Sequence, residues 1–310
     1  MPRLYKSIID NAEGYVVEVL FELLFNKDSI LPPFTSRTMR SILFKAPCLR
    51  DVASLYVKSK SHKPVTLRVL RADGRPLYKL YSKSGSESKP YIVKAGNTLQ
   101  GALAFYKKTL DNTIYEVFAC DDDVDIGYAE IHVQAVKLNI YNIKEFSLGI
   151  DSSYKVNFIT PLLITTKTMT PPTIRNLRLW RIIKESRQAY RLFPTPGYIL
   201  SQAMRQWLAL VQGIEPSKSW YPYSIGRLGD VLAAETDYQL TPVTAFYRRG
   251  EKGLVLVRGV RGYVIYTLLN EALRDVVDKL LSFASIMGLG KSRSIGFGEI
   301  AVKPLNQDSG

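Results

Sequence analysis

The spacing of apolar and polar positions predicts a chain of mixed strands and helices. A dense apolar run over Val16–Leu24 and an alternating stretch over Ile126–Ile140 are typical of strands. Between them, Thr35 or Ser36 is placed to cap a helix that runs to about Lys45. Shorter signals in the same half predict a second short helix and the two arms of a hairpin, at Cys48–Tyr56, Val65–Leu70 and Leu77–Tyr81.

The second half of the chain carries a clearer pattern. It predicts a strand, two helices, a hairpin, an amphipathic helix and a last strand, over Tyr154–Thr165, Thr195–Gln212, Ser224–Thr236, Leu240–Arg249, Leu254–Leu268, Glu271–Met287 and Phe297–Lys303. This is the βαββαβ order of a ferredoxin-like (RRM-like) domain, and the first half follows it more loosely. The pattern lapses around Ser147–Ser153. We therefore expect an α+β protein with tandem ferredoxin-like domains, residues 1–147 and 148–310.

Charge points to a polymeric partner. The chain holds 42 Lys and Arg against 28 Asp and Glu, a formal net charge of +14. This excess favours nucleic acid, although a basic protein without such a partner is the alternative. The basic residues are spread over loops and strands rather than along one helix face, which argues against membrane binding. The chain start lacks the apolar region of a signal peptide, so we expect a cytoplasmic protein.

The cysteines and the acidic run give little support for a metal. Cys48 and Cys120 stand far apart without zinc-type spacing, and a disulfide between them stays open. Asp121–Asp125 reads as a solvated acidic turn, because metal nucleases gather carboxylates from separate elements. We expect neither a metal nor a cofactor.

A glycine-rich loop near the end of the chain, Gly288–Gly298, is the strongest chemical signal. Glycine amides can approach an anion closely, and successive amides can form a concavity for a phosphate. The spacing excludes a Walker A loop and a dinucleotide fingerprint, because Ser285 and Arg293 stand where those motifs need glycine. The loop residues expected to contact a phosphate chain are Gly288, Gly290, Lys291, Ser292, Arg293, Gly296 and Gly298.

Several further segments match a known family. They are Ser29–Arg40, Ser61–Pro64, Phe158–Pro161, Leu240–Thr244, Arg258–Tyr263 and the glycine loop. With them the chain resembles the CRISPR-associated endoribonucleases of Cas family six, in the RAMP superfamily, and most closely the crenarchaeal branch. The resemblance implies two ferredoxin-like domains with a basic cleft. It also implies metal-independent cutting of precursor RNA, in which the RNA's own 2′-hydroxyl attacks and leaves a 2′,3′-cyclic phosphate and a 5′-hydroxyl.

The resemblance also suggests catalytic residues. Many family members place a histidine in or after the first helix, but Thr35–Leu43 contains none. The crenarchaeal branch offers basic residues instead, at positions that match Arg37, Arg40 and Lys63. Arginine can bind a dianionic phosphorane through its planar fork, although it cannot act as a base near neutral pH. His62 is a fourth catalytic candidate because imidazole passes protons near neutrality, and an ordinary loop histidine is the alternative.

RNA contacts are expected from two further basic groups. One is the ladder of Arg175, Arg178, Arg181, Lys184, Arg187 and Arg191, and the other decorates the second-domain hairpin, at Arg248, Arg249, Arg258 and Arg261. Such contacts make affinity salt-dependent. Trp180 and Tyr190 lie within the ladder, either to stack on bases or to pack in the core. His132, on the polar face of a predicted strand, is expected to have a surface or structural role.

The resemblance names CRISPR repeat RNA as the partner. It leaves open a homodimer and an association with an interference complex. Because the first helix lacks a histidine, a non-catalytic RNA-binding RAMP subunit of such a complex is the alternative function. A generic tandem RNA-binding protein, whose affinity would follow RNA length and salt, is the third.

Overall fold

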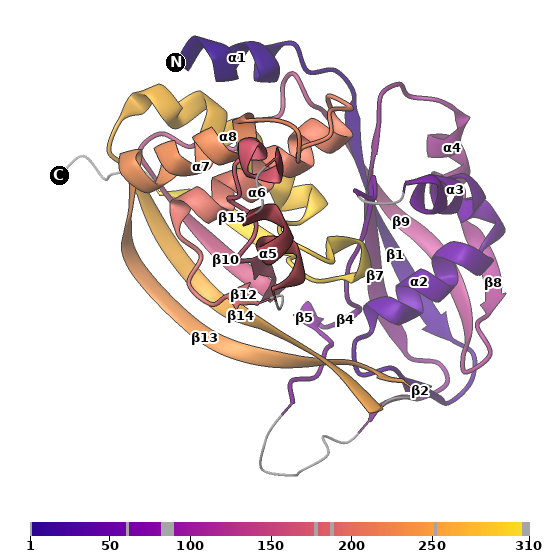
Figure 1. Cartoon of the computed structure of the whole chain (residues 1–310). Helices are drawn as coiled ribbons and strands as arrows, with labels where there is room; N and C mark the ends of the chain where they lie inside the picture. The colour runs from indigo at the N-terminus through magenta and orange to yellow at the C-terminus, as the bar shows by residue number, and fades with distance from the viewer. Residues whose placement is uncertain are drawn as a thin grey trace.

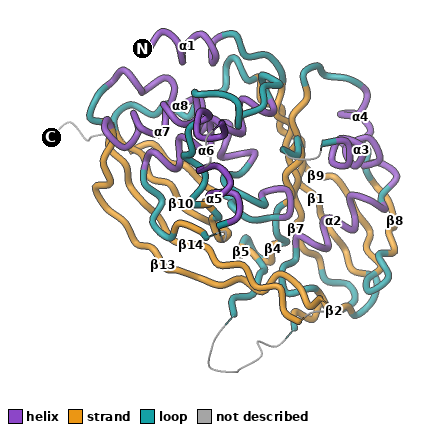
Figure 2. The backbone as a smooth tube through the Cα atoms, in the orientation of Figure 1, coloured by secondary structure: helices purple, strands orange, loops and turns teal. Residues whose placement is uncertain are grey.

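The computed structural model describes residues 2–59, 62–81, 90–176, 179–186, 189–250 and 253–305. Two antiparallel sheets lie side by side, each covered by its own helices (Figure 1). Figure 2 shows α2, α3 and α4 beside one sheet, and α6, α7 and α8 beside the other. Among these described ranges, no helix is long and apolar enough to cross a membrane.

The N-terminal domain is a ferredoxin-like unit with added strands. Its elements are β1 (Tyr15–Phe25), β2 (Ser29–Leu31), α2 (Ser36–Lys45), α3 (Arg50–Lys58), β3 (Val65–Leu67), β4 (Arg71–Ala72), β5 (Arg75–Pro76), β6 (Tyr91–Val93), β7 (Thr98–Lys107), α4 (Asn112–Phe118), β8 (Asp121–Asp125) and β9 (Glu130–Asn142). The sheet order is β5-β4-β7-β1-β9-β8, with β3 also on β7, while β2 and β6 form a separate ribbon. Alternate positions of β1, such as Val19 and Phe21, are buried with Met39 and Ile42 of α2.

The C-terminal domain follows the expected order closely. Its elements are β10 (Ser153–Leu162), β11 (Ile164–Thr165), α5 (Leu179–Glu185), β12 (Tyr190–Arg191), α6 (Pro196–Leu210), α7 (Tyr221–Leu232), β13 (Ala233–Gly250), β14 (Gly253–Leu268), α8 (Arg274–Met287) and β15 (Ile300–Leu305). The sheet order β13-β14-β10-β15 is that of a ferredoxin-like fold. The N-terminal helix α1 (Pro2–Asp10) belongs to this core, where Tyr5 and Ile9 are buried.

Several local expectations differ from the structure. The paired strands of the predicted first-half hairpin are only Arg71–Ala72 and Arg75–Pro76, while Val65–Leu67 pairs with β7. Asp121–Asp125 is the edge strand β8 rather than a solvated turn, because its backbone pairs with β9. The helix predicted over Ser224–Thr236 ends at Leu232, since Ala233 to Glu235 pair with β14. The central strand β7 was not expected, and its second half is almost continuously buried, which hides the alternation of a strand.

A shared core joins the two domains. Phe34 and Tyr78 pack in it with Phe297 from the C-terminal half, and the Phe34 and Phe297 rings stack with centroids 4.2 Å apart. The segment around Leu80 adds to the edge of β13 through a bridge with Ala245. The long β13–β14 hairpin accordingly reaches across to the N-terminal domain (Figure 1).

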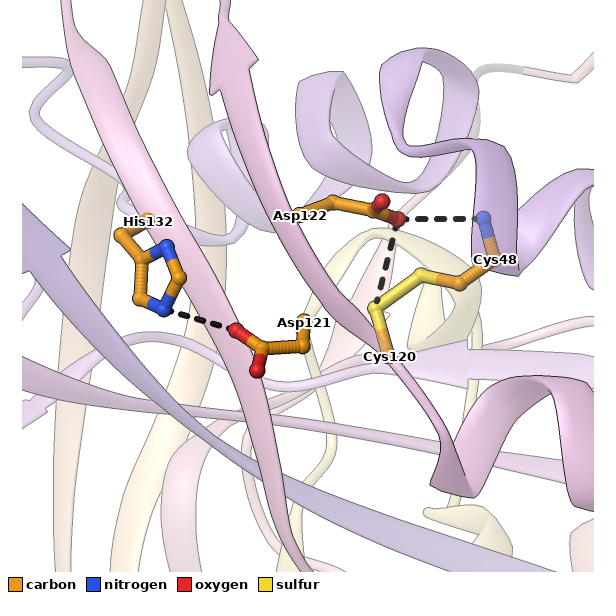
Figure 3. Close-up of a disulfide and its surroundings, with 5 residues drawn as sticks. All are labelled: Cys48, Cys120, Asp121, Asp122 and His132. Carbon is orange, nitrogen blue, oxygen red and sulfur yellow. Dashed lines mark hydrogen bonds and ion pairs between the residues drawn. A yellow bond between two sulfur atoms is a disulfide. The ribbon is translucent and has the colours of Figure 1, made fainter.

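A disulfide joins Cys48 to Cys120, a bond that the sequence left open. It connects the turn between α2 and α3 to the start of β8, across 72 positions of sequence. Figure 3 shows Asp122 beside it, accepting a hydrogen bond of 3.3 Å from the Cys48 amide. The bond restrains α2 and α3 on the sheet of the N-terminal domain.

Reduction of this disulfide should destabilise the protein. Closing so long a loop restricts the unfolded chain, so we expect the free energy of unfolding to fall by roughly 2–4 kcal/mol in reductant. Chemical denaturation with and without reductant measures the change. The double variant Cys48→Ser with Cys120→Ser is the control, and its free energy of unfolding should be the same with and without reductant. Two alkylatable thiols in the unreduced protein would contradict the prediction.

Candidate active site and RNA interface

Helix α2 turns its basic face toward the second domain. Its apolar residues Met39, Ile42 and Leu43 are buried against the N-terminal sheet. Arg37 and Arg40 lie three positions apart on the remaining face, and Arg37 is half-buried while Arg40 is exposed. The helix therefore presents two guanidinium groups at the seam between the domains.

Tyr247 of β13 faces these two arginines from the other domain. Burial raises the pKa of its phenol, and the positive charges of Arg40 and Arg37 act against that rise. The Tyr247 ring centroid lies 5.9 Å from that of Phe34 and 6.0 Å from that of Phe297. Both arginines are thus placed over the core that joins the two halves.

Tyr56 of α3 brings Lys63 to the same place. The Arg40 guanidinium lies 5.9 Å from the centroid of the Tyr56 ring, and the Lys63 ammonium lies 4.9 Å from it. The Lys63 Nζ also donates a hydrogen bond of 2.7 Å to the Tyr56 carbonyl. In the described part of the chain, Arg37, Arg40 and Lys63 form no ion pair with a carboxylate, unlike Arg68 and Arg71. We call Arg37, Arg40 and Lys63 the cationic cluster.

The buried Arg293 side chain holds the backbone of Lys63. It donates to the Lys63 carbonyl, to the Thr66 hydroxyl at 2.7 Å and to the Met287 carbonyl at 3.4 Å. Burial lowers the pKa of the guanidinium to about 9. These three bonds to protein oxygens give Arg293 a structural role, and its contact with RNA stays a prediction.

The glycine loop also packs against other segments of the chain. Its amides at Leu289 and Lys291 donate to carbonyls of Gly298 and Leu163. Gly296 lies against the start of α2, where a Cβ would come within 2.6 Å of the Ser36 side chain. The Ser36 hydroxyl donates a hydrogen bond of 2.6 Å to the Ile295 carbonyl. The loop thus positions the helix that carries the arginines.

Comparison with known families decides the identity of the fold. Residues 17–141 match the Cas6 N-terminal domain family, and residues 156–300 match the CRISPR-associated endoribonuclease Cas6 family. The chain belongs to the Cas6 family. The expected family, endoribonuclease class and tandem ferredoxin-like fold are therefore confirmed.

Individual relatives agree over most of the chain. Two proteins of Saccharolobus solfataricus, CRISPR-associated endoribonucleases Cas6 2 and Cas6 1, are each 24% identical to it. The alignments cover 92% and 94% of this chain, and 96% and 98% of those proteins. Among solved structures, a Cas6 product complex has a TM-score of 0.57 at 16% identity, covering 93% of this chain and 99% of that one. Thermus thermophilus Cas6 has a TM-score of 0.57 at 14% identity, covering 94% and 100%.

A cavity of about 320 Å³ opens in this Cas6 chain beside Lys63. Its wall is formed by the turn before β3, the segment after β11, Trp180 of α5, three residues of α6 and the glycine loop. Lys291 and Ser292 line it, and both stay predicted RNA contacts. His62 lines it as well, and burial lowers the pKa of His62 to about 4, assisted by the charges of Arg293 and Arg205. The imidazole is therefore neutral near pH 7 when no anion is bound.

The other predicted contacts lie in different places. Arg258 and Arg261 are exposed on β14, and the Arg261 guanidinium lies 5.7 Å from the centroid of the Tyr78 ring. Arg181 is exposed on α5 and pairs with Glu185. Of Arg175 only the backbone is described. The predictions for Arg178 and Arg187 lie outside the described residues. For Lys184, Arg248 and Arg249, too, only the backbone is described.

The structure places Trp180, Tyr190 and His132 in three different surroundings. Trp180 lines the cavity, whereas Tyr190 packs against the core between the domains. The two ring nitrogens of His132 lie 2.8 Å from the Asp121 carboxylate and 3.0 Å from the Asp123 carboxylate. Figure 3 shows the contact with Asp121. This pairing fits the structural role expected of His132.

One group of metal-type donors occurs among the described residues. The sulfurs of Cys48 and Cys120 and the Asp122 carboxylate lie within 4.8 Å of one another. Because the two sulfurs are bonded to each other, they are not thiolate ligands.

The sequence did not identify Tyr56, Tyr247 or Arg205 as residues of the site. Tyr56 and Tyr247 belong to elements whose pattern indicates only packing. Arg205 carried a usable signal, because it is the sole charged residue in the otherwise uncharged helix Pro196–Leu210. A lone cation in such a helix has to face solvent or a polar cavity.

The glycine loop generates a matched pair of stability predictions. Gly298 has φ of 67°, and an added Cβ would overlap the Leu289 carbonyl oxygen. Gly213 has φ of 65° in open space. We expect Gly298→Ala to cost about 3 kcal/mol or more, and Gly213→Ala about 1–2 kcal/mol, measured by chemical denaturation. Equal costs would show that backbone strain alone, and not packing of the loop, requires glycine at 298.

The pKa of His62 predicts an acid sensitivity. The unfolded imidazole titrates near 6.5 and the folded one at about 4, so the unfolded state binds more protons between these values. Stability should therefore fall as the pH drops through this window. The decrease in melting temperature between pH 7 and pH 4.5 should be smaller for His62→Gln than for wild type. Identical decreases would argue that His62 keeps an ordinary pKa.

Proposed function

We propose that this Cas6 chain cleaves CRISPR precursor RNA within the repeat, without a metal ion. The RNA's own 2′-hydroxyl attacks the adjacent phosphate, and the products carry a 2′,3′-cyclic phosphate and a 5′-hydroxyl. The observation that carries the proposal is the convergence of the cationic cluster at Tyr56 and Tyr247 on the domain seam. The Saccharolobus relatives, both named CRISPR-associated endoribonucleases, support the reaction class.

The cationic cluster suits the charge that develops during this reaction. The guanidinium groups of Arg37 and Arg40 can each bind two oxygens of a dianionic phosphorane. The Lys63 ammonium uses one of its three donors on the Tyr56 carbonyl. Its remaining protons can stabilise the phosphorane or protonate the leaving 5′-oxygen. Charge that is fixed in advance, together with in-line alignment of the 2′-hydroxyl, supplies the rate enhancement.

His62 adds a proton-transfer group that depends on the RNA. Its imidazole is neutral beside the charges of Arg293 and Arg205. A phosphate bound in the cavity would raise the pKa of His62, because negative charge favours the imidazolium form. His62 would then titrate closer to the working pH when RNA is bound.

The RNA path includes the cavity and the hairpin. Lys291 and Ser292 lie at the cavity, and Arg258 and Arg261 are exposed on β14 at the junction of the domains. Each phosphate contact contributes to a salt-dependent affinity. Arg181 lies on α5, the element that also carries Trp180.

A non-catalytic RNA-binding subunit is the second candidate, and the absence of histidine from α2 favours it. This subunit would bind repeat RNA without turnover and co-purify with other interference subunits. Size-exclusion chromatography of the same preparation also tests the homodimer that the resemblance leaves open.

The central experiment is single-turnover cleavage of repeat RNA in excess EDTA. We expect cleavage by the wild type, and no cleavage when the nucleotide before the scissile phosphate has a 2′-hydrogen. Arg40→Ala and Lys63→Ala should each reduce the rate by about 10²- to 10³-fold, the usual cost of one preorganised donor. Binding of the 2′-deoxy RNA should change by less than about tenfold.

Arg227→Ala is the matched control, because Arg227 is an exposed helix arginine on α7. It should retain the wild-type rate. A product with a 3′-hydroxyl, or a rate that vanishes with EDTA, would reject the metal-independent mechanism. Wild-type rates in both Arg40→Ala and Lys63→Ala would reject the assignment of these residues.

A further inference from the structure

The cavity beside Lys63 is built for a ligand larger than one phosphate. Its volume of about 320 Å³ falls within the range of small-molecule pockets. Five cations contribute to its wall, namely Lys63, Lys167, Arg205, Lys291 and Arg293, and no Asp or Glu is among the described residues that line it. This lining selects an anion, and its size leaves room for a ring beside the anion.

The uncharged part of the wall fits a nucleobase. Trp180 supplies an indole, and aromatic rings stack on bases of any sequence. Gln206 is 1% exposed, and its Nε2 donates to the Met287 carbonyl at 3.3 Å. In the described part of the structure its Oε1 has no hydrogen-bond partner. A buried acceptor without a donor is costly, and an N–H group on the edge of a base would satisfy it.

We propose that this cavity holds one unpaired nucleotide of the RNA substrate. The base lies against Trp180 with its polar edge toward Gln206, and the phosphate lies between Lys291 and Arg205. The proposal rests on the proposed function for its position along the RNA. Lys63 belongs both to the cavity wall and to the cationic cluster, so the bound nucleotide adjoins the scissile linkage.

Removing single bases from the RNA tests the proposal directly. The probe is repeat RNA with one abasic nucleotide at each position in turn, made uncleavable by a 2′-hydrogen at the scissile nucleotide. With wild-type protein, one position beside the cut should weaken binding by roughly 5- to 150-fold, the range for one stacked base. Trp180→Ala should weaken binding of intact RNA by a similar factor and should be insensitive to base removal at that position.

Two further variants provide controls. Trp220→Ala removes a half-exposed tryptophan outside the cavity wall and should retain both the wild-type affinity and the abasic response. Trp180→Phe keeps an aromatic face and should restore most of the affinity if Trp180→Ala is correctly folded. Lys291→Ala and Arg205→Gln should each lower the salt slope of binding by about 0.7.

Each outcome decides between occupants. If the losses from Trp180→Ala and from base removal multiply at every position, no base contacts Trp180 and the proposal is overturned. If AMP or inorganic phosphate saturates the cavity while no RNA position is coupled to Trp180, the site belongs to a free anion and the proposal is also overturned. Coupling at one position in an RNA that the wild type does not cleave would support the pocket while rejecting the proposed function.

Discussion

The rest of the site depends on the hydrogen bonds that the buried guanidinium of Arg293 donates. It comes from the last glycine loop and binds the Lys63 carbonyl and the Thr66 hydroxyl, more than 200 residues earlier in the chain. Burial lowers its pKa to about 9, yet it stays charged near neutral pH. An uncompensated buried charge is expensive, so the three oxygens around it must keep their positions. The backbone of Lys63 is thereby tied to the second domain.

The same loop secures the other half of the cationic cluster. Because Gly296 has no side chain, the start of α2 can pack directly against it, and the Ser36 hydroxyl donates a hydrogen bond to the Ile295 carbonyl. Behind the loop, Glu299 forms ion pairs with Arg68 and Arg71 of the N-terminal domain, and Arg68 also pairs with Glu18 at 2.6 Å. The glycine loop therefore connects the domains. Cations from two N-terminal segments are held at one point by a C-terminal element.

Two sets of cations link this architecture to function. Arg68 and Arg71 are neutralised by carboxylates in the seam, where they serve the fold. The cationic cluster and the cavity wall gather positive charge with no carboxylate among the described lining residues of the cavity. Like charges held this close repel one another, and a phosphate chain relieves that repulsion. The charge distribution of this Cas6 chain therefore favours a polyanion, and RNA is one.

The local spacing of residue types determined the order of elements in the second half, the basic face of α2 and the basic character of the glycine loop. Each of these follows from neighbours within a few turns or strand positions. Tertiary structure alone decided that Arg293 is buried, that Tyr56 unites Arg40 with Lys63, and that the acidic run becomes an edge strand. Tertiary structure also explains why β7 was not predicted, since a strand that is buried on both faces does not alternate between apolar and polar residues. The physical reason is that burial and pairing depend on separate segments, which lie more than 200 residues apart for Arg293 and Lys63, and no local pattern records that these segments meet.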